Sequence, residues 1–330
     1  MKPHEPPPGS RPTRIAVTHG DPNGIGPEVV LKSLTRARLS RYVETVLVGS
    51  PKVFRLHAER MGLGERALDS VEIVDPVPGS RAAVQFGEIT QQAGRLAMKA
   101  VEKATDMALL GKVEALVTAP ISKEAISLAG FDVPGHTEFI ARRAKSNAYA
   151  MMLVADALRI GLVTGHIAIW DVPKRITEKA VVDSIQVMVR SLKRDFGITK
   201  PKIAVLGLNP HAGDGGVLGR EEGKAIAPAI EDCRRRGTLA FGPFAADGFF
   251  GVGSWRNYDA TLAMYHDQGL VAFKALAFES GVNFTAGLPI VRTSPDHGTA
   301  FNIAGKNAAS EGSMCSAMLL ARDIVRQRSA

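Results

Sequence analysis

The sequence predicts an α/β protein with a largely parallel sheet, folded as two lobes with a cleft between them. From residue 14 onward, short runs rich in β-branched residues alternate with amphipathic stretches, a pattern typical of α/β proteins. The chain has 330 residues, and compact domains mostly run to about 100–200 residues, so two lobes are expected. A hydrophobic content of 45% is enough for a sizeable core.

The expected elements follow from local patterns. Residues 1–13 contain five prolines and no apolar periodicity, so we expect a disordered leader. Strands are expected at apolar or β-branched runs: residues 15–18, 45–48, 115–118, 151–154, 160–163, 203–206, 261–265 and 282–285. Helices are expected where apolar residues recur at helical spacing: residues 94–110, 177–196, 219–236 and 311–326. Lobe boundaries are expected near residues 120–123 and 275–285.

Composition argues against several classes of protein. No run approaches the roughly 20 apolar residues of a membrane span, and the polar, proline-rich N-terminus does not resemble a secretory signal. Cys233 and Cys315 lie far apart, in neither a CxxC nor a Cys/His cluster, so we expect no disulfide framework, no structural zinc site and a cytoplasmic location. The net charge of +8 is spread along the chain without a dense basic run, which favours small anions such as phosphate esters and dinucleotides over nucleic acid.

A glycine-rich segment, residues 20–28 (GDPNGIGPE), follows the first expected strand and opens a helix. A phosphate-binding loop would occupy this place. It is neither a GxGxxG fingerprint nor a Walker motif, and a tight turn remains an equal alternative to a substrate or cofactor role. Asp21 and Asn23 are therefore weak candidates for ligand contacts. Residues 219–225 resemble a phosphate-binding loop only superficially, because the spacing is wrong and no Ser or Thr follows Lys224.

Five of the eight histidines lie where apolar runs end, the positions at which α/β proteins gather catalytic groups. Three of them, His166, His211 and His266, follow separate expected strands and are candidates for one catalytic metal with an open coordination position. Asp247 and Asp267 are candidates for oxygen ligands or for orienting an imidazole. For any single histidine, a backbone hydrogen bond is the usual alternative role.

Two further groups indicate ligand binding. His136 and Thr137 at the start of a helix, together with Lys274, Asn283 and Arg292, are suited to an anion, because helix N-termini and guanidinium groups bind carboxylate and phosphate. Solvated surface charge is the alternative for the two cations. Residues 296–307 are rich in small and amide side chains. They resemble the adenosine-binding loop of the isopropylmalate and isocitrate dehydrogenase superfamily; a purely structural capping loop is the alternative.

Taken together, the motifs resemble the 4-hydroxythreonine-4-phosphate dehydrogenase (PdxA) family of vitamin B6 biosynthesis, from about Arg14 to the C-terminus. The segments that carry the resemblance are residues 20–28, 134–139, 208–213, 263–269 and 292–300. The resemblance implies two α/β/α lobes of the isocitrate/isopropylmalate dehydrogenase type. One comprises residues 14–125 and 280–330 and carries the cofactor loop; the other comprises residues 126–279 and carries the metal ligands and the dimer interface.

The resemblance also implies a set of site residues. The metal ligands fall on His166, His211 and His266, with one histidine supplied by the partner chain of a homodimer. The substrate contacts fall on His136, Thr137, Lys274, Asn283 and Arg292. The cofactor contacts fall on His297, Gly298, Thr299, Ala300, Asn302, Ala304, Gly305, Lys306 and Asn307. The general base remains open between Lys274, Asp247 and a water molecule.

The implied reaction is the NAD- or NADP-dependent oxidation of 4-phosphooxy-L-threonine to a β-keto acid, which decarboxylates to 3-amino-2-oxopropyl phosphate. A divalent metal (zinc, cobalt, magnesium or manganese) would act as a Lewis acid; imidazole ligands suit zinc, cobalt and other divalent ions, and magnesium is less expected. The alternative is a dehydrogenase of the same fold that acts on D-threonate or D-erythronate 4-phosphate. A metal-dependent hydrolase is a more distant alternative, because it leaves the loop at residues 296–307 without a role.

Overall fold

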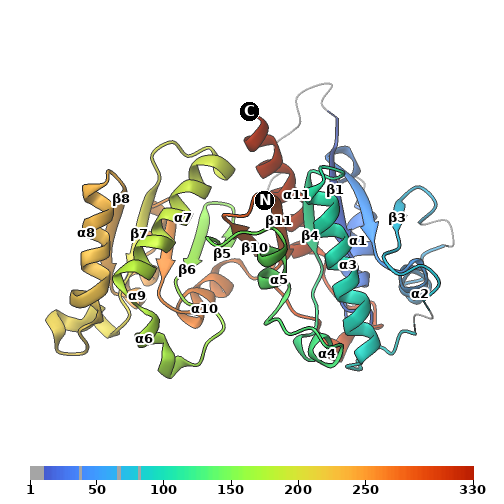
Figure 1. Cartoon of the computed structure of the whole chain (residues 1–330), viewed down its shortest axis with the longest axis horizontal. Helices are drawn as coiled ribbons and strands as arrows, with labels where there is room; N and C mark the ends of the chain where they lie inside the picture. Colours follow the sequence, from blue (N-terminus) through green and yellow to red (C-terminus); the bar gives the residue numbers. More distant parts are fainter. Residues whose placement is uncertain (1–10, 37–38, 65–67, 81–82) are drawn as a thin grey trace. The chain divides into compact units, whose positions relative to one another are not determined.

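A computed structural model describes residues 11–36, 39–64, 68–80 and 83–330 (Figure 1). Its contacts divide the chain into two units, which comprise the described parts of Met1–Asn147 with Leu288–Arg326, and of Ala148–Gly287 with Gln327–Ala330. Most of the expected leader, residues 1–10, lies outside the described residues. Its last residues do not fit that expectation, because Arg11 forms an ion pair with Glu114 and the first strand begins at Thr13.

The first unit contains a parallel sheet of five strands in the order β3-β2-β1-β4-β11. Their bounds are β1 Thr13–Thr18, β2 Val43–Val48, β3 Glu72–Val74, β4 Ala115–Thr118 and β11 Val291–Pro295. The expected α/β class and parallel pairing are confirmed in this unit. β3 and β11 were not expected, because β3 is short and β11 contains Arg292 and ends in proline.

The helices of this unit are α1 Gly26–Leu34, α2 Pro51–Arg60, α3 Gln91–Leu109, α4 Lys123–Leu128, α5 His136–Arg143 and, as far as Arg326, α11 Gly312–Ser329. Ala16, Val46 and Leu116 of the sheet share a core with α3 and α5. Arg143 of α5 also pairs with Asp106 of α3 at 2.6 Å. These contacts keep α5 in the first unit, which continues to Asn147. The sequence placed a boundary near residues 120–123, and the family resemblance implied one after residue 125.

The second unit contains six strands in the order β10-β5-β6-β9-β7-β8. Their bounds are β5 Ala150–Ala155, β6 Leu158–Leu162, β7 Lys202–Leu206, β8 Leu239–Phe244, β9 Ala260–Ala263 and β10 Val282–Ala286. β5 runs antiparallel to both β10 and β6, and the other pairs are parallel. The expectation of parallel pairing is wrong for β5 and β6, because only Asp156 and Ala157 join them. A two-residue connection makes an antiparallel hairpin, whereas a parallel pair needs a crossover.

The helices of this unit are α6 Val172–Arg175, α7 Glu178–Phe196, α8 Ala227–Arg235, α9 Ala246–Gly251 and α10 His266–Ala277. α7 and α10 cover opposite faces of the sheet, because Gly161 of β6 faces Met188 of α7 while its neighbours Ile160 and Leu162 face Gly269 of α10. The helix expected over residues 219–236 begins instead as a π-helical turn, Glu222–Ile226, before α8.

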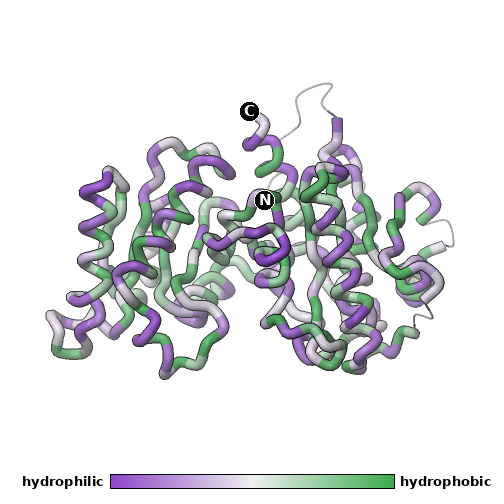
Figure 2. Tube along the Cα trace, viewed as in Figure 1, coloured by the Kyte–Doolittle hydropathy of each residue, from purple (hydrophilic) through white to green (hydrophobic). Residues whose placement is uncertain are grey.

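Apolar residues follow the expected periodicities. Figure 2 shows green and purple segments alternating along the long helices α3 and α7, as one buried and one solvated face require. Thr90 and Thr177 begin these two helices, with side-chain oxygens that accept hydrogen bonds from Ala93 N and Ala180 N. Among the described helices, none is both long and apolar enough to cross a membrane.

Candidate active site

His166 and His266 lie side by side beyond the carboxyl ends of two neighbouring strands, β6 and β9, in the second unit. β6 and β9 are neighbouring parallel strands, and backbone bonds from Val163 N to Ala263 O (2.9 Å) and Thr164 N to Met264 O (3.1 Å) continue their pairing beyond the strand ends. The chain after each strand therefore reaches the same place. The two imidazole rings lie 5.2 Å apart, centroid to centroid.

A carboxylate orients one of these rings. His266 Nδ1 lies 2.7 Å from Asp267 Oδ1, so Nδ1 carries the proton in this contact and Nε2 is left as the ligand atom. This is the usual arrangement of a metal-binding histidine, in which an acceptor fixes the tautomer and ring orientation. Two neighbouring imidazoles, one of them held by a carboxylate, fit a divalent metal that prefers nitrogen ligands.

His211 lies in a loop of unusual backbone conformation. The residues from His211 to Gly215 all have positive φ, and three of them, His211, Ala212 and Asp214, are not glycine. Left-handed backbone costs about 1–2 kcal/mol for each non-glycine residue and is retained mainly where the surrounding structure enforces it. His211, the first residue of this run, is exposed.

Glu222 holds the base of the His211 loop. Its Oε1 accepts hydrogen bonds from Leu208 N (2.8 Å) and Asn209 N (2.7 Å), and its Oε2 accepts one from Asn209 Nδ2 (2.9 Å). The carboxylate is buried, and burial alone would raise its pKa, but the hydrogen bonds that it accepts outweigh burial and lower the pKa. Sequence reasoning missed this role, because Glu222 lies in the segment set aside as a false phosphate-binding loop.

The structure brings together two of the three expected metal ligands. Among the described residues, no group of three or more His, Cys, Asp and Glu side chains is close enough to hold one metal ion. Exposed apolar side chains follow each histidine along the chain: Trp170 is 75% exposed, Val217 is 80% exposed and Val271 is 68% exposed. Ile169 beside Trp170 and Leu218 beside Val217 are exposed as well, and contiguous apolar side chains left in water mark surfaces that bind other molecules.

Three other expected residues lie in the second unit. Lys274 is on α10, eight residues or about two turns after His266, so both lie on one side of the helix. Asn283 is on β10, and its Oδ1 is enclosed without a hydrogen-bond partner in the described structure. Asp247 lies in the first turn of α9. Lys274 and Asp247 are both exposed, so burial does not distinguish between them as a base.

Arg292, His136 and Thr137 converge in the first unit. Arg292 of β11 is opposite Leu116 of β4, on the sheet face covered by α5, and its side chain is 0% exposed. Its Nη2 donates to Thr118 Oγ1 at 2.7 Å, and its Nη1 donates to Thr137 Oγ1 at 3.3 Å. Burial lowers the pKa of Arg292 to about 9, against the opposing attraction of Glu138.

His136 begins α5 beside this guanidinium. Burial, and then the charges of Arg292 and Lys123, hold the pKa of His136 well below its ordinary value, so the ring is neutral at neutral pH. Its Nδ1 is enclosed and has no hydrogen-bond partner in the described structure. A helix N-terminus, a neutral imidazole and a buried guanidinium together have the chemistry needed to bind an anion.

The expected cofactor residues form one loop after β11. Gly298, Asn302, Lys306 and Asn307 are exposed, and His297, Thr299, Ala300 and Gly305 are half-buried, whereas Ala304 is buried. The loop turns through left-handed backbone at Ala300 and Asn307, and Arg60 Nε donates to Gly305 O at 2.9 Å. Most of its side chains therefore remain accessible to a ligand.

The glycine-rich segment, residues 20–28, packs against this loop and hydrogen-bonds to it. Ile25 N donates to Thr299 O at 2.9 Å, and a Cβ on Gly24 would lie 2.8 Å from the same oxygen, so the close approach requires glycine. Asn23 fixes the segment through bonds to Gln85 N (2.8 Å) and Glu88 O (2.8 Å). Of the two roles left open, the positions of Gly24 and Asn23 favour the structural turn. Asp21 differs, because its Oδ2 is buried without a partner in the described structure and burial raises its pKa to about 6.

The similarity of this chain to known proteins extends over nearly its whole length. Residues 33–321 match the family of pyridoxal phosphate biosynthetic protein PdxA. The chain is 43% identical over 326 residues to 4-hydroxythreonine-4-phosphate dehydrogenase of Bacteroides thetaiotaomicron, covering 96% of this chain and 89% of the relative. It is 40% identical over 323 residues to D-threonate 4-phosphate dehydrogenase of Salmonella typhimurium, covering 94% and 98%. The crystal structure of 4-hydroxythreonine-4-phosphate dehydrogenase from Klebsiella pneumoniae matches with a TM-score of 0.84 and 37% identity, covering 96% and 99%.

Proposed function

Because the chain belongs to the family of pyridoxal phosphate biosynthetic protein PdxA, we propose that it is a cytoplasmic dehydrogenase of 4-phosphooxy-L-threonine. The C3 hydroxyl is oxidised with NAD or NADP, and the β-keto acid loses CO₂ to give 3-amino-2-oxopropyl phosphate. Hydride leaves from C3 to the dinucleotide, and the hydroxyl proton leaves to a base. When CO₂ departs, the electron pair of the broken C1–C2 bond stays on C2, which then takes up a proton. The product then serves pyridoxal 5′-phosphate biosynthesis.

The observation that carries this proposal is the buried cation at Arg292. Burial lowers the pKa of this guanidinium to about 9 because its charge is poorly solvated, and pairing with an anionic ligand would offset that desolvation. The enclosed Nδ1 of neutral His136 and the hydroxyl of Thr137 add directional contacts. A substrate with a phosphate and a carboxylate matches this chemistry. Lys274 and Asn283 are the proposed contacts from the second unit.

The proposed metal ligands are His166, His211 and His266. When bound, a nicotinamide would accept hydride from C3, and a divalent metal such as zinc, cobalt, manganese or magnesium would act as a Lewis acid on the C3 oxygen. Asp267 holds the His266 ring in the tautomer that a ligand requires. Glu222 holds the loop that presents His211. The base that removes the hydroxyl proton is Lys274, Asp247 or a bound water.

The active site is proposed to be shared between two chains of a homodimer. His166 and His266 are adjacent in one chain, whereas His211 is exposed in a separate loop. The apolar side chains of Trp170, Val217 and Val271, each within six residues of one of these histidines, would be covered by a second copy. In such a dimer, His211 of one chain completes the ligand set begun by His166 and His266 of the other.

The first test is NAD(P)H formation with 4-phosphooxy-L-threonine and, in parallel, with D-threonate 4-phosphate, each with and without a metal chelator. Turnover of the amino acid phosphate that the chelator abolishes supports the substrate and the metal together. Turnover that the chelator leaves unchanged would overturn the metal's role. Reduction of neither dinucleotide with either substrate would overturn the proposed function.

The second candidate substrate is D-threonate 4-phosphate. The observation that favours it is the 40% identity to the Salmonella typhimurium enzyme of that name over 94% of this chain. Both substrates offer a phosphate and a carboxylate to Arg292 and His136, and they differ in the amine or hydroxyl at C2. Higher kcat/KM for the sugar acid in the same assay would retain the site and change the substrate.

A further inference from the structure

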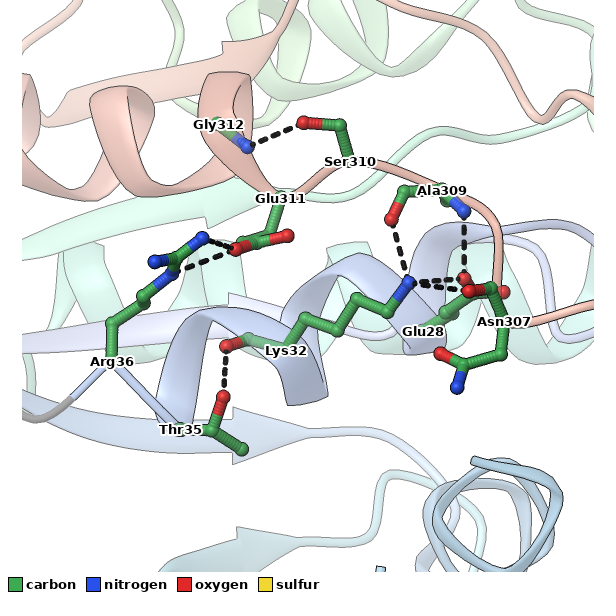
Figure 3. A network of polar contacts seen from close by, with 9 residues as sticks. All are labelled: Glu28, Lys32, Thr35, Arg36, Asn307, Ala309, Ser310, Glu311 and Gly312. Atoms are coloured by element: carbon green, nitrogen blue, oxygen red, sulfur yellow. Dashed lines mark hydrogen bonds and ion pairs between the residues drawn. The ribbon is translucent and has the colours of Figure 1, made fainter. Parts of the chain in front are cut away.

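Side chains on one face of α1 bind residues 307–311, the segment at the end of the proposed cofactor loop (Figure 3). Glu28 and Lys32 lie four residues apart on α1, and Arg36 follows two residues after the helix ends. All three contact the segment from Asn307 to Glu311, which is more than 270 residues away in sequence. Four-residue spacing places these side chains on one side of the helix.

Lys32 is the centre of this network. Its Nζ donates to Glu28 Oε1 (2.9 Å), Asn307 O (3.1 Å) and Ala309 O (2.7 Å). An ammonium group has three N–H donors, so all three are used. The Lys32 side chain is only 20% exposed and that of Glu28 is 1% exposed. The ion pair is therefore shielded from the solvent that weakens surface pairs.

Glu28 binds the same segment of backbone as Lys32. Its Oε1 also accepts a hydrogen bond from Ala309 N at 2.9 Å, so both backbone groups of buried Ala309 bind the ion pair. Asn307, whose carbonyl binds Lys32, has left-handed backbone. At the other end of the loop, Ile25 N binds Thr299 O. The loop is thus held at both ends, at Thr299 and at residues 307–309, by α1 and the residue that precedes it.

We propose that Glu28 and Lys32 are positioning residues for the dinucleotide, which hold the loop of residues 299–309 in the form that binds NAD(P). The inference rests on the proposed function, because it takes this loop as the cofactor site. Neither side chain needs to touch the cofactor. The apparent affinity of a ligand falls in proportion to the fraction of protein in the binding form, so a loosened loop weakens cofactor binding without altering the reacting groups.

The test is the dissociation constant of NAD and NADP, measured by calorimetry on the full chain without substrate. Lys32→Met leaves the Glu28 carboxylate and two carbonyls without their shared donor, and we expect the dissociation constant of the preferred dinucleotide to rise roughly tenfold or more. Hydrogen exchange of the amides at residues 299–309 should accelerate in the same variant. In turnover, KM for the dinucleotide should rise, while kcat at saturating dinucleotide and KM for the phosphorylated substrate change by less than about twofold.

Two matched variants separate positioning from a general effect. Lys179→Met removes another lysine from an i,i+4 ion pair, with Asp183, but its side chain is 83% exposed and lies on α7 in the second unit, so dinucleotide affinity should not change. Arg36→Met removes the exposed ion pair with Glu311 and should have a much smaller effect than Lys32→Met. If Lys32→Met does not fold, Glu28→Gln retains the shape of the side chain and tests the same contact.

The outcomes distinguish the inference from the function on which it rests. Wild-type protein that binds a dinucleotide, with unchanged affinity and unchanged loop exchange in both Lys32→Met and Glu28→Gln, overturns the inference alone. Equal losses of kcat and of affinity for both substrates in Lys32→Met would also overturn it, because that result indicates general damage. Wild-type protein that binds neither NAD nor NADP overturns the proposed function and the inference with it.

Discussion

The shared-site proposal predicts that two inactive variants will restore activity to each other. His211→Ala and His266→Ala homodimers each lack one metal ligand in every site, so each alone should be inactive. After subunit exchange, a heterodimer has one site that contains intact His166 and His266 from one chain and intact His211 from the other. The second site of the same heterodimer lacks two ligands.

The magnitude follows from counting sites. Random exchange of equal amounts gives about half heterodimers, and each has one complete site of two, so the mixture should regain roughly a quarter of wild-type activity. The assay is chelator-sensitive NAD(P)H formation, with native mass spectrometry to confirm that subunits have exchanged.

The structure also supplies the control. His166 and His266 lie 5.2 Å apart in one chain, so they belong to the same half of a site. Exchange between His166→Ala and His266→Ala homodimers leaves every site incomplete, and this mixture should stay inactive. No regained activity in the first mixture after confirmed exchange, or equal recovery in both mixtures, would refute the assignment of His211 to the partner chain.

Three further predictions concern single residues. Glu222→Gln should lower metal affinity about 10–100-fold with dinucleotide affinity unchanged, as measured by competition with a chromophoric chelator. The control is Glu221→Gln, because the Glu221 carboxylate also accepts a hydrogen bond from Asn209. This control should have the smaller effect, and equal effects would contradict the role of Glu222. Arg292→Lys should lower kcat/KM for the phosphorylated substrate roughly a hundredfold, because a single ammonium cannot reproduce the planar group that binds Thr118, Thr137 and an anion; unchanged kcat/KM would remove Arg292 from the site. Asp21→Asn should stabilise the protein above pH 6. Burial raises the pKa of Asp21 from 3.8 to about 6, so the folded state favours the protonated acid. The wild type therefore loses stability as pH rises through that interval, by at most about 3 kcal/mol. Chemical denaturation of both proteins at pH 4 and pH 8 measures this, and an equal difference at the two pH values would show that the charge is not the cause.

The sequence predicted elements whose local pattern agrees with their place in the fold. β1, β4, β7 and α7 begin and end within about two residues of their expected bounds, because β-branched runs and helical periodicity directly reflect burial. α10 was missed because its first turn, His-Asp-Gln-Gly, is polar and contains glycine, a composition typical of a loop after a strand. The strand expected over residues 261–265 ends at Ala263. β8 was missed because it contains glycine and proline, which are rare in strand interiors.

The site was predictable to the extent that its residues form motifs. The histidines, Arg292 and the loop after β11 were singled out from the sequence, but their neighbours were not. Thr118 binds a side chain 174 residues away, and Lys32 binds carbonyls about 275 residues away. Contacts of this kind arise from the order of strands in the sheet and from the packing of helices, and no local sequence pattern predicts them. For the same reason, the spacing of the three histidines did not indicate that only His166 and His266 would meet.

The conformation of the His211 loop links these observations. Three non-glycine residues in left-handed backbone, His211, Ala212 and Asp214, cost several kcal/mol together, and the hydrogen bonds to Glu222 offset part of that cost. A surface loop with no role would relax to ordinary backbone or use glycine at these positions. Retaining the strain keeps His211 in one place while its ring is exposed, as its proposed role as a ligand to a metal on a second chain would require. Val217 follows directly after this loop. The loop therefore holds His211, which would complete the metal site, close in sequence to an apolar side chain that the second chain would bury.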